Sequence, residues 1–182
     1  MIRFDKLGFA LPPLILTFCL GTACTSHRVG SSQDLNSQLQ ATSSDPIRLD
    51  SSQPPKAGSE AIFKSLNAFR ITLPPHVLLT YDPALAERGR TRWQVMEKDI
   101  RVTIGPSAFP SWSLLGSTLG HELEVHCQQN LTLIGMMASL GAPSIAAAET
   151  DAYRYELAQA PRFGLSPAEQ DLVRRSLAGI SP

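Results

Sequence analysis

The stretch Ser117–Asn130, STLGHELEVHCQQN, carries His121 and His126 five residues apart, with Glu122 directly after the first histidine. On a regular α-helix each residue advances about 100°, so positions five apart lie about 140° apart around the axis. The two imidazoles then point in different directions. One extra residue in the turn, a π-bulge, brings positions i and i+5 onto one face, and such bulges concentrate at functional sites. The chemistry of this stretch therefore depends on whether the helix bulges between Glu122 and His126.

Three interpretations fit this spacing. In a bulged helix His121 and His126 both face a metal ion such as zinc, which also needs an open position for water, and a nearby carboxylate can act as general base on that water. In a regular helix Glu122 and His126, four residues apart, share a face, which makes Glu122 a ligand. In the third interpretation there is no metal, and Glu122 and His126 are an ordinary pair on a solvated helix face.

A later acidic segment, ETDAYRYE at 149–156, offers further groups for a metal site. Glu149 is the first residue of this segment. Tyr153 lies four residues later and shares the helix face of Glu149, so it is a candidate donor to an oxyanion beside the metal. Asp151 or Glu156 could orient a histidine through its second ring nitrogen.

The hexapeptide HELEVH at 121–126 resembles the H-E-x-x-x-H helix of the dipeptidyl peptidase III zinc peptidases. In that family both histidines bind zinc, the glutamate after the first histidine is the catalytic base, and a glutamate on a later helix is the third ligand. The resemblance implies that His121, His126 and Glu149 bind zinc and that Glu122 is the base. It covers only the hexapeptide and the downstream acidic helix of a much shorter chain.

A broader resemblance runs from VTIGPSAF (102–109) through LGSTLGHELEVH (115–126) and ETDAYRYE (149–156) to RFGLS (162–166). These segments resemble zincin-like metallopeptidase domains of Rhs-type polymorphic toxins and related exported bacterial proteins. The resemblance implies a zinc-dependent hydrolase, foremost a peptidase acting on a peptide or protein. The alternative is a non-enzymatic envelope lipoprotein, a binding or scaffold module with a degenerate metal motif.

The N-terminus, MIRFDKLGFALPPLILTFCLGTACTS, has the layout of an export signal. Arg3 and Lys6 are followed by the apolar run Leu7–Leu20 and then by small residues before Cys24, as in a signal peptide. A cysteine after small residues resembles the lipobox of bacterial lipoproteins. This resemblance implies a signal peptide over 1–23, lipidation of Cys24 and a membrane anchor in the bacterial cell envelope, periplasm-facing or in the outer membrane; plain secretion is the alternative.

Residues 24–58 are dense in Ser, Gln, Asn, Asp and Pro, which predicts a flexible linker. Residues 59–182 then form one domain of α+β class, a minimal zincin-like fold with a small sheet and packed helices. The patterns predict a helix after 59, strands at 76–82 and 99–105, a long helix at about 115–140, a second at about 144–160 and a last helix after Ser166. The strand at 99–105 is expected to be the sheet edge beside the metal, and the apolar run 131–148 to be a buried helix pair.

Composition excludes two classes of protein. The chain carries 16 Lys and Arg against 16 Asp and Glu, and this balance argues against a nucleic-acid partner, which needs clustered basic charge. Cys127 is the only cysteine of the predicted domain, so a fold held together by disulfides is excluded.

Overall fold

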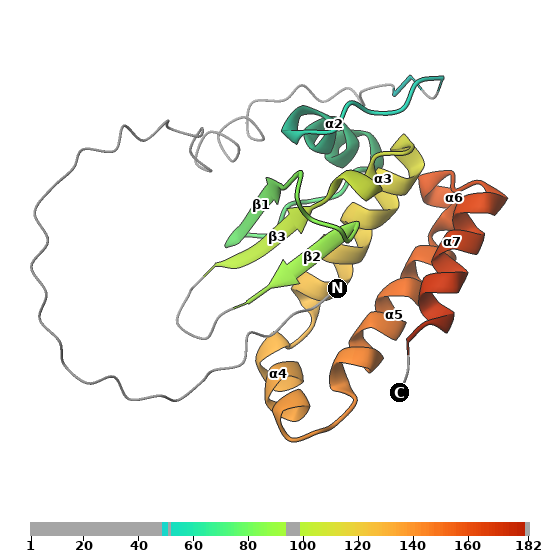
Figure 1. Ribbon diagram of the computed structural model, residues 1–182. Coiled ribbons are helices and arrows are strands. Elements are labelled where there is room, and N and C mark those ends of the chain that lie inside the picture. Colours follow the sequence, from blue (N-terminus) through green and yellow to red (C-terminus); the bar gives the residue numbers. More distant parts are fainter. Residues whose placement is uncertain (1–48, 51, 94–98, 181–182) are drawn as a thin grey trace, which may run out of the picture. The chain divides into compact units, whose positions relative to one another are not determined.

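The computed structural model describes residues 49–50, 52–93 and 99–180 (Figure 1). The predicted signal peptide, Cys24 and most of the predicted linker lie outside these residues. A search of the described residues finds no helix with the length and apolar character that a membrane span requires.

The domain is α+β, as the order of the predicted elements indicates, and its sheet has three strands. β1 (Val77–Tyr81), β3 (Ile100–Ile104) and β2 (Gly89–Arg92) follow one another in that order across the sheet. β3 runs parallel to β1 and antiparallel to β2. The expectation that the strand at 99–105 is the sheet edge is therefore wrong, because β2 pairs with its outer side from Gly89↔Ile104 to Arg92↔Arg101.

The helices follow the predicted order, with one break that the sequence patterns did not reveal. The helical segments are α2 (Ser59–Phe69), the 3₁₀ turn η1 (Pro106–Ala108), α3 (Trp112–Gly120), η2 (His121–Val125), η3 (His126–Gln128), α4 (Leu131–Ser139), α5 (Ser144–Ala158), α6 (Ala160–Phe163) and α7 (Pro167–Ala178). The expected continuous helix 115–140 is interrupted after Gln128. Gln129 is extended, and the Asn130 side chain caps α4 by accepting a hydrogen bond from the Leu133 backbone N–H at 3.0 Å.

The α4 helix is less buried than its apolar sequence predicts. Leu131 at its start is buried, but Leu133, Met136, Met137 and Leu140 are 40–76% exposed. The expectation of a buried helix pair over 131–148 is therefore wrong for α4. In the described part of the chain, Leu131 and Ile134 of α4 pack in one cluster with Ala148 and Ile145 of α5 and with Trp93 and Ile100. The exposed apolar residues further along α4 lie outside this cluster.

The helix that leads into HELEVH is fixed by close packing on two sides. In Figure 1, α3 lies between the sheet and the helices α5 to α7. Gly116 and Gly120, four residues apart, share one face of α3. A Cβ atom at Gly120 would come within 2.7 Å of the Phe163 ring, and one at Gly116 would overlap the Phe69 ring. The two rings meet edge to face, with centroids 5.5 Å apart. These contacts set the position of the turn that follows α3.

Candidate metal centre

The turn after α3 is π-helical, which is the bulged geometry of the first of the three interpretations. It covers His121–Val125, and the His126 backbone N–H is hydrogen bonded to the carbonyls of both His121 and Glu122. The bond from residue 126 to residue 121 is the i to i−5 bond that defines a π-turn. The extra residue brings the two imidazoles together, so that their Nε2 atoms lie 3.0 Å apart.

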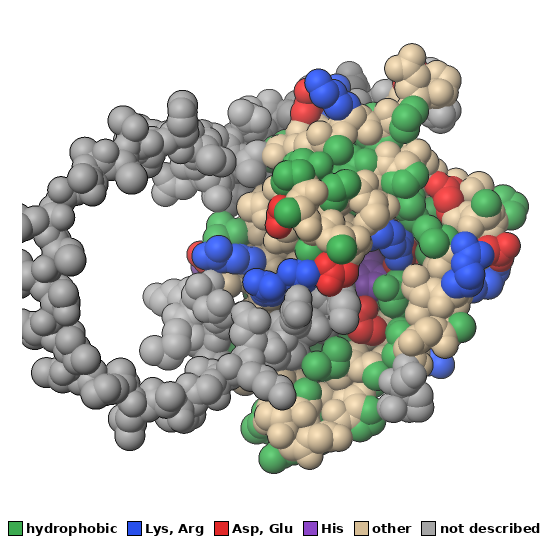
Figure 2. All heavy atoms as spheres, in the orientation of Figure 1, with side chains coloured by type: hydrophobic (Ala, Val, Ile, Leu, Met, Phe, Trp, Pro, Cys, Tyr) green, Lys and Arg blue, Asp and Glu red, His purple; other side chains and the backbone are tan. Residues whose placement is uncertain are grey.

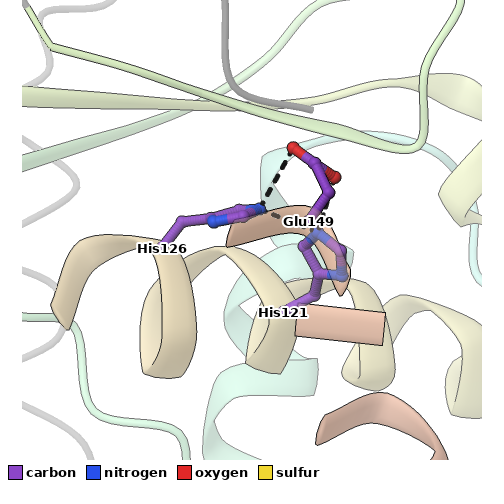
Figure 3. Close-up of side chains that lie close together, drawn as sticks. All are labelled: His121, His126 and Glu149. Atoms are coloured by element: carbon purple, nitrogen blue, oxygen red, sulfur yellow. Dashed lines mark hydrogen bonds and ion pairs between the residues drawn. The ribbon is translucent and has the colours of Figure 1, made fainter. Parts of the chain in front are cut away.

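Glu149 of α5 completes a cluster of three candidate ligands (Figure 3). Its Oε2 lies 3.7 Å from His121 Nε2, and its Oε1 lies 3.5 Å from His126 Nε2. One ligand atom from each of the three residues lies within 4.8 Å of the others. All three side chains are buried. The two histidines of the spacing argument and the glutamate that the family resemblance implies are therefore the residues that converge.

Hydrogen bonds on the far side of each ring fix which nitrogen faces the cluster. His121 Nδ1 lies 2.8 Å from Glu156 Oε1, and His126 Nδ1 lies 2.8 Å from Gln129 Oε1. The Gln129 amide is oriented by its own NH₂ group, which donates to the Ala148 carbonyl at 3.2 Å. Both partners are acceptors, so each Nδ1 carries a proton. Each Nε2 of a neutral ring then presents a lone pair to the cluster.

These lone pairs require a cation. Two Nε2 lone pairs at 3.0 Å repel each other, and the Glu149 carboxylate adds negative charge beside them. A shared proton or a metal ion relieves the repulsion. Two imidazole nitrogens and one carboxylate oxygen are the ligand set of catalytic zinc sites, which keep a fourth position for water. The residues present therefore fit a zinc ion, and within the described part of the chain they form the group of His, Cys, Asp and Glu side chains suited to a metal.

Glu156, two helical turns after Glu149, is the carboxylate that orients His121. Its side chain is fully buried and also accepts hydrogen bonds from both Arg88 Nη atoms at 3.0 Å and from Ser117 Oγ at 2.6 Å. Burial by itself raises the pKa of Glu156. The opposite effect of His121 and Arg88 is larger and lowers this pKa to about 2, so the carboxylate stays ionised. Asp151, the other candidate for this role, is exposed.

Charge within the cluster shifts the pKa values of its members. Burial lowers the pKa of His121, but hydrogen bonds to Glu149 and Glu156 raise it more, to about 9. Burial raises the pKa of Glu149, but its hydrogen bonds with His121 and His126 hold it well below its ordinary range. In the absence of a metal, the raised pKa of His121 favours its protonated form near neutral pH.

The predicted base Glu122 lies beside the cluster and contacts strand β2. Its side chain is 1% exposed, and its Oε2 accepts a hydrogen bond from Thr91 Oγ1 at 2.7 Å. The group of converging ligand atoms consists of His121, His126 and Glu149 and does not include Glu122. The arrangement therefore favours the bulged-helix interpretation over the one in which Glu122 is a ligand.

Tyr153 lies against the first ligand. Its ring centroid is 4.8 Å from that of His121, and the Arg88 guanidinium carbon is 5.8 Å from the tyrosine centroid. Burial raises the pKa of Tyr153, so its hydroxyl keeps its proton at neutral pH. In the space-filling view a small area of histidine is visible in a recess near the middle of the domain, beside basic and acidic side chains (Figure 2). His121 keeps 3% and Glu149 keeps 6% of its surface exposed, so the centre is buried but not completely sealed from solvent.

Several residues of this site carry no recognisable signal in the sequence. Arg88, Gly89 and Thr91 come from the segment ERGRTRWQ, whose sequence predicts a turn at Gly89 and then an irregular or extended piece. Gln129 and Ser117 flank the motif but belong to no pattern. Cys127, which follows His126, is half-buried, and burial raises the pKa of its thiol to about 12, so it is not a thiolate.

Comparisons with known proteins leave the interpretation of this site to its geometry. A scan against protein-family models finds no match, and searches of curated proteins and of solved structures find none either. The fold and the site together define an α+β domain with a buried group of two histidines and one glutamate that could hold a metal ion.

Proposed function

We propose that this domain is a zincin-like, zinc-dependent hydrolase whose substrate is a peptide or protein, and that a lipid on Cys24 anchors it in the bacterial cell envelope. The observation that carries the proposal is the convergence of His121, His126 and Glu149 across a π-turn, with Glu122 beside them. The resemblance of HELEVH to the dipeptidyl peptidase III helix and the broader zincin-like resemblance support the same assignment.

Each residue has a definite role in this proposal. His121, His126 and Glu149 hold zinc, which supplies Lewis acidity and lowers the pKa of a bound water. Glu122 takes a proton from the attacking water and passes it to the leaving amine nitrogen as the C–N bond breaks. Tyr153, which is protonated, donates a hydrogen bond to the negative charge that develops on the carbonyl oxygen.

Strand β2 offers a place for an extended substrate. It is an edge strand of the sheet and contacts the π-turn that bears the motif. An extended peptide can add to such an edge through main-chain hydrogen bonds, with pockets reading its alternate side chains. A peptide bound there would run past Glu122, which β2 contacts through Thr91.

The experiment that tests the proposal measures metal content and hydrolysis on the same purified protein. We expect about one zinc per chain, lost in His121→Ala and His126→Ala. Glu122→Gln should keep the zinc and lose hydrolysis of a peptide library, because the amide cannot take the proton. A wild-type protein without transition metal contradicts the proposal. A protein that holds zinc but cleaves no peptide would instead support the alternative, a non-enzymatic lipoprotein with a degenerate site.

A further inference from the structure

Two inward positions of strand β2 meet the same carboxylate. Thr91 is fully buried, and its hydroxyl donates to Glu122 Oε2 at 2.7 Å. Gly89, two residues earlier and on the same face of the strand, leaves room for the rest of that side chain. A Cβ atom at Gly89 would lie 2.8 Å from Glu122 Cγ, and closer still to Oε1. Gly89 thus makes room for the Glu122 side chain, and Thr91 binds its carboxylate.

This contact explains how Glu122 can lie beside a metal centre without binding the metal. Glu122 adjoins His121 in the chain, and both side chains are buried. A fourth protein ligand would close a tetrahedral zinc site, and closed sites are structural, whereas catalytic sites keep one position for water. A buried carboxylate near a cation needs strong hydrogen bonds elsewhere to stay away from it.

We propose that Thr91 and Gly89 are positioning residues that hold Glu122 away from the metal and thereby keep one coordination position open. This inference rests on the metal ion of the proposed function but needs no hydrolysis. Strand β2 can hold Glu122 in place because β2 is itself fixed by two contacts. Thr91 lies opposite Val102 of the central strand, and Arg88, just before β2, pairs with the buried Glu156.

The test uses Co(II), whose visible absorption reports its coordination number, with the purified full chain. Thr91→Val keeps the shape of the side chain and removes the donor. We expect Glu122 to turn to the metal in this variant, so that Co(II) binds about tenfold more tightly, an effect of the size typical for groups around the first ligands. The absorption should weaken as the coordination number rises. Thr91→Ser keeps a hydroxyl and should match the wild type.

A double variant separates positioning from simple packing. In Thr91→Val with Glu122→Gln, the amide is a poor ligand, so the affinity and the spectrum should equal those of Glu122→Gln alone. Gly89→Ala should have the same effect, because its Cβ displaces the Glu122 side chain while the Thr91 hydroxyl stays in place. This variant replaces Thr91→Val in the test if Thr91→Val does not fold. Unchanged or weaker Co(II) binding in the folded variants overturns the inference.

The outcomes also separate this inference from the proposed function. A wild-type protein that cleaves peptides, together with a Thr91→Val variant of wild-type spectrum and affinity, overturns the inference alone. The expected spectral change in Thr91→Val, together with a wild-type protein that cleaves nothing, overturns the proposed hydrolysis alone.

Discussion

Glu149 and Glu156, two turns apart on α5, contact opposite nitrogens of the same imidazole. Glu149 Oε2 lies 3.7 Å from His121 Nε2, and Glu156 Oε1 lies 2.8 Å from His121 Nδ1. Residues seven apart share one helix face, so one helix both supplies a candidate ligand and orients another. Arg88 neutralises the second carboxylate, which leaves Glu149 as the acidic group among the three candidate ligands.

The first prediction concerns Glu156. In Glu156→Gln the amide oxygen can still accept from His121, but Arg88 loses its buried counter-charge. We expect zinc affinity to fall by about 10- to 100-fold, as for other groups that orient metal ligands. The free energy of unfolding should fall by about 3–5 kcal/mol, the cost of breaking a buried ion pair. Competition titration with a zinc chelator and urea unfolding measure the two effects.

Asp151→Asn is the matched control for this prediction. It removes one charge from the same helix at an exposed position. We expect zinc affinity to stay as in the wild type and stability to change by no more than about 0.5 kcal/mol. Equal effects in the two variants would show that Glu156 has no special relation to His121.

The second prediction is a pH dependence of the metal-free protein. The pKa of His121 rises from 6.5 to about 9 in the folded state, so folding is stabilised by its proton. This contribution to the free energy of unfolding amounts to roughly 3 kcal/mol. It is fully present below pH 6.5 and is lost as the pH rises to about 9. Urea unfolding in the presence of a chelator should show the loss. The zinc-loaded protein should not show it, because the metal takes the place of the proton.

Two histidine variants check this assignment. His121→Gln removes the titrating ring, so stability should no longer fall between pH 6.5 and 9. His76→Gln changes a histidine whose side chain is 72% exposed, and the pH dependence should persist. A metal-free wild type whose stability rises over this interval would rule out a proton bound within the cluster.

The third prediction concerns Gln129, which holds the second ligand. Gln129→Met removes the acceptor of the His126 Nδ1 proton and the donor to the Ala148 carbonyl. His126 is then free to take its other tautomer, and zinc affinity should fall about tenfold. Gln128→Met is the matched control, since this neighbour is exposed, and it should bind zinc like the wild type. Isothermal titration calorimetry with zinc measures the affinity of both variants; equal affinities would contradict the prediction.

The spacing in HELEVH limited the ligand geometry to a few alternatives, because a π-turn brings His121 and His126 onto one face, whereas a regular helix pairs Glu122 with His126. The α+β class likewise followed from the order of periodic segments, and the capping box of Ser166 and Glu169 located the start of the last helix. Both signals are local. They depend on angles between neighbours along the chain rather than on tertiary packing.

The remainder of the site depends on contacts between distant segments. GRTR at 89–92 does not alternate apolar and polar residues, so the sequence indicated only an irregular or extended piece there and not the edge strand of the sheet. Its role became visible only through the pairing with β3 and the contact between Thr91 and Glu122. The selection of Glu156 over Asp151 also required the structure, because one is buried against Arg88 and the other is exposed.

The last prediction concerns how the start of α3 is held. Glu169 accepts hydrogen bonds from Ser166 N and Ser166 Oγ, both at 2.7 Å, and from Ser111, which caps α3. Glu169→Gln weakens the capping box, and we expect a loss of about 1 kcal/mol in unfolding free energy with zinc affinity unchanged. Burial by itself raises the pKa of Glu169, but these hydrogen bonds lower it below its ordinary value. The wild-type advantage should therefore be present above pH 4.5 and disappear on further acidification.

Glu60→Gln is the control for this prediction. It breaks an exposed pair with Lys64 and should cost less than about 0.5 kcal/mol. Equal losses in the two variants, measured by urea unfolding at pH 7, would mean that Glu169 does not link the two helix starts.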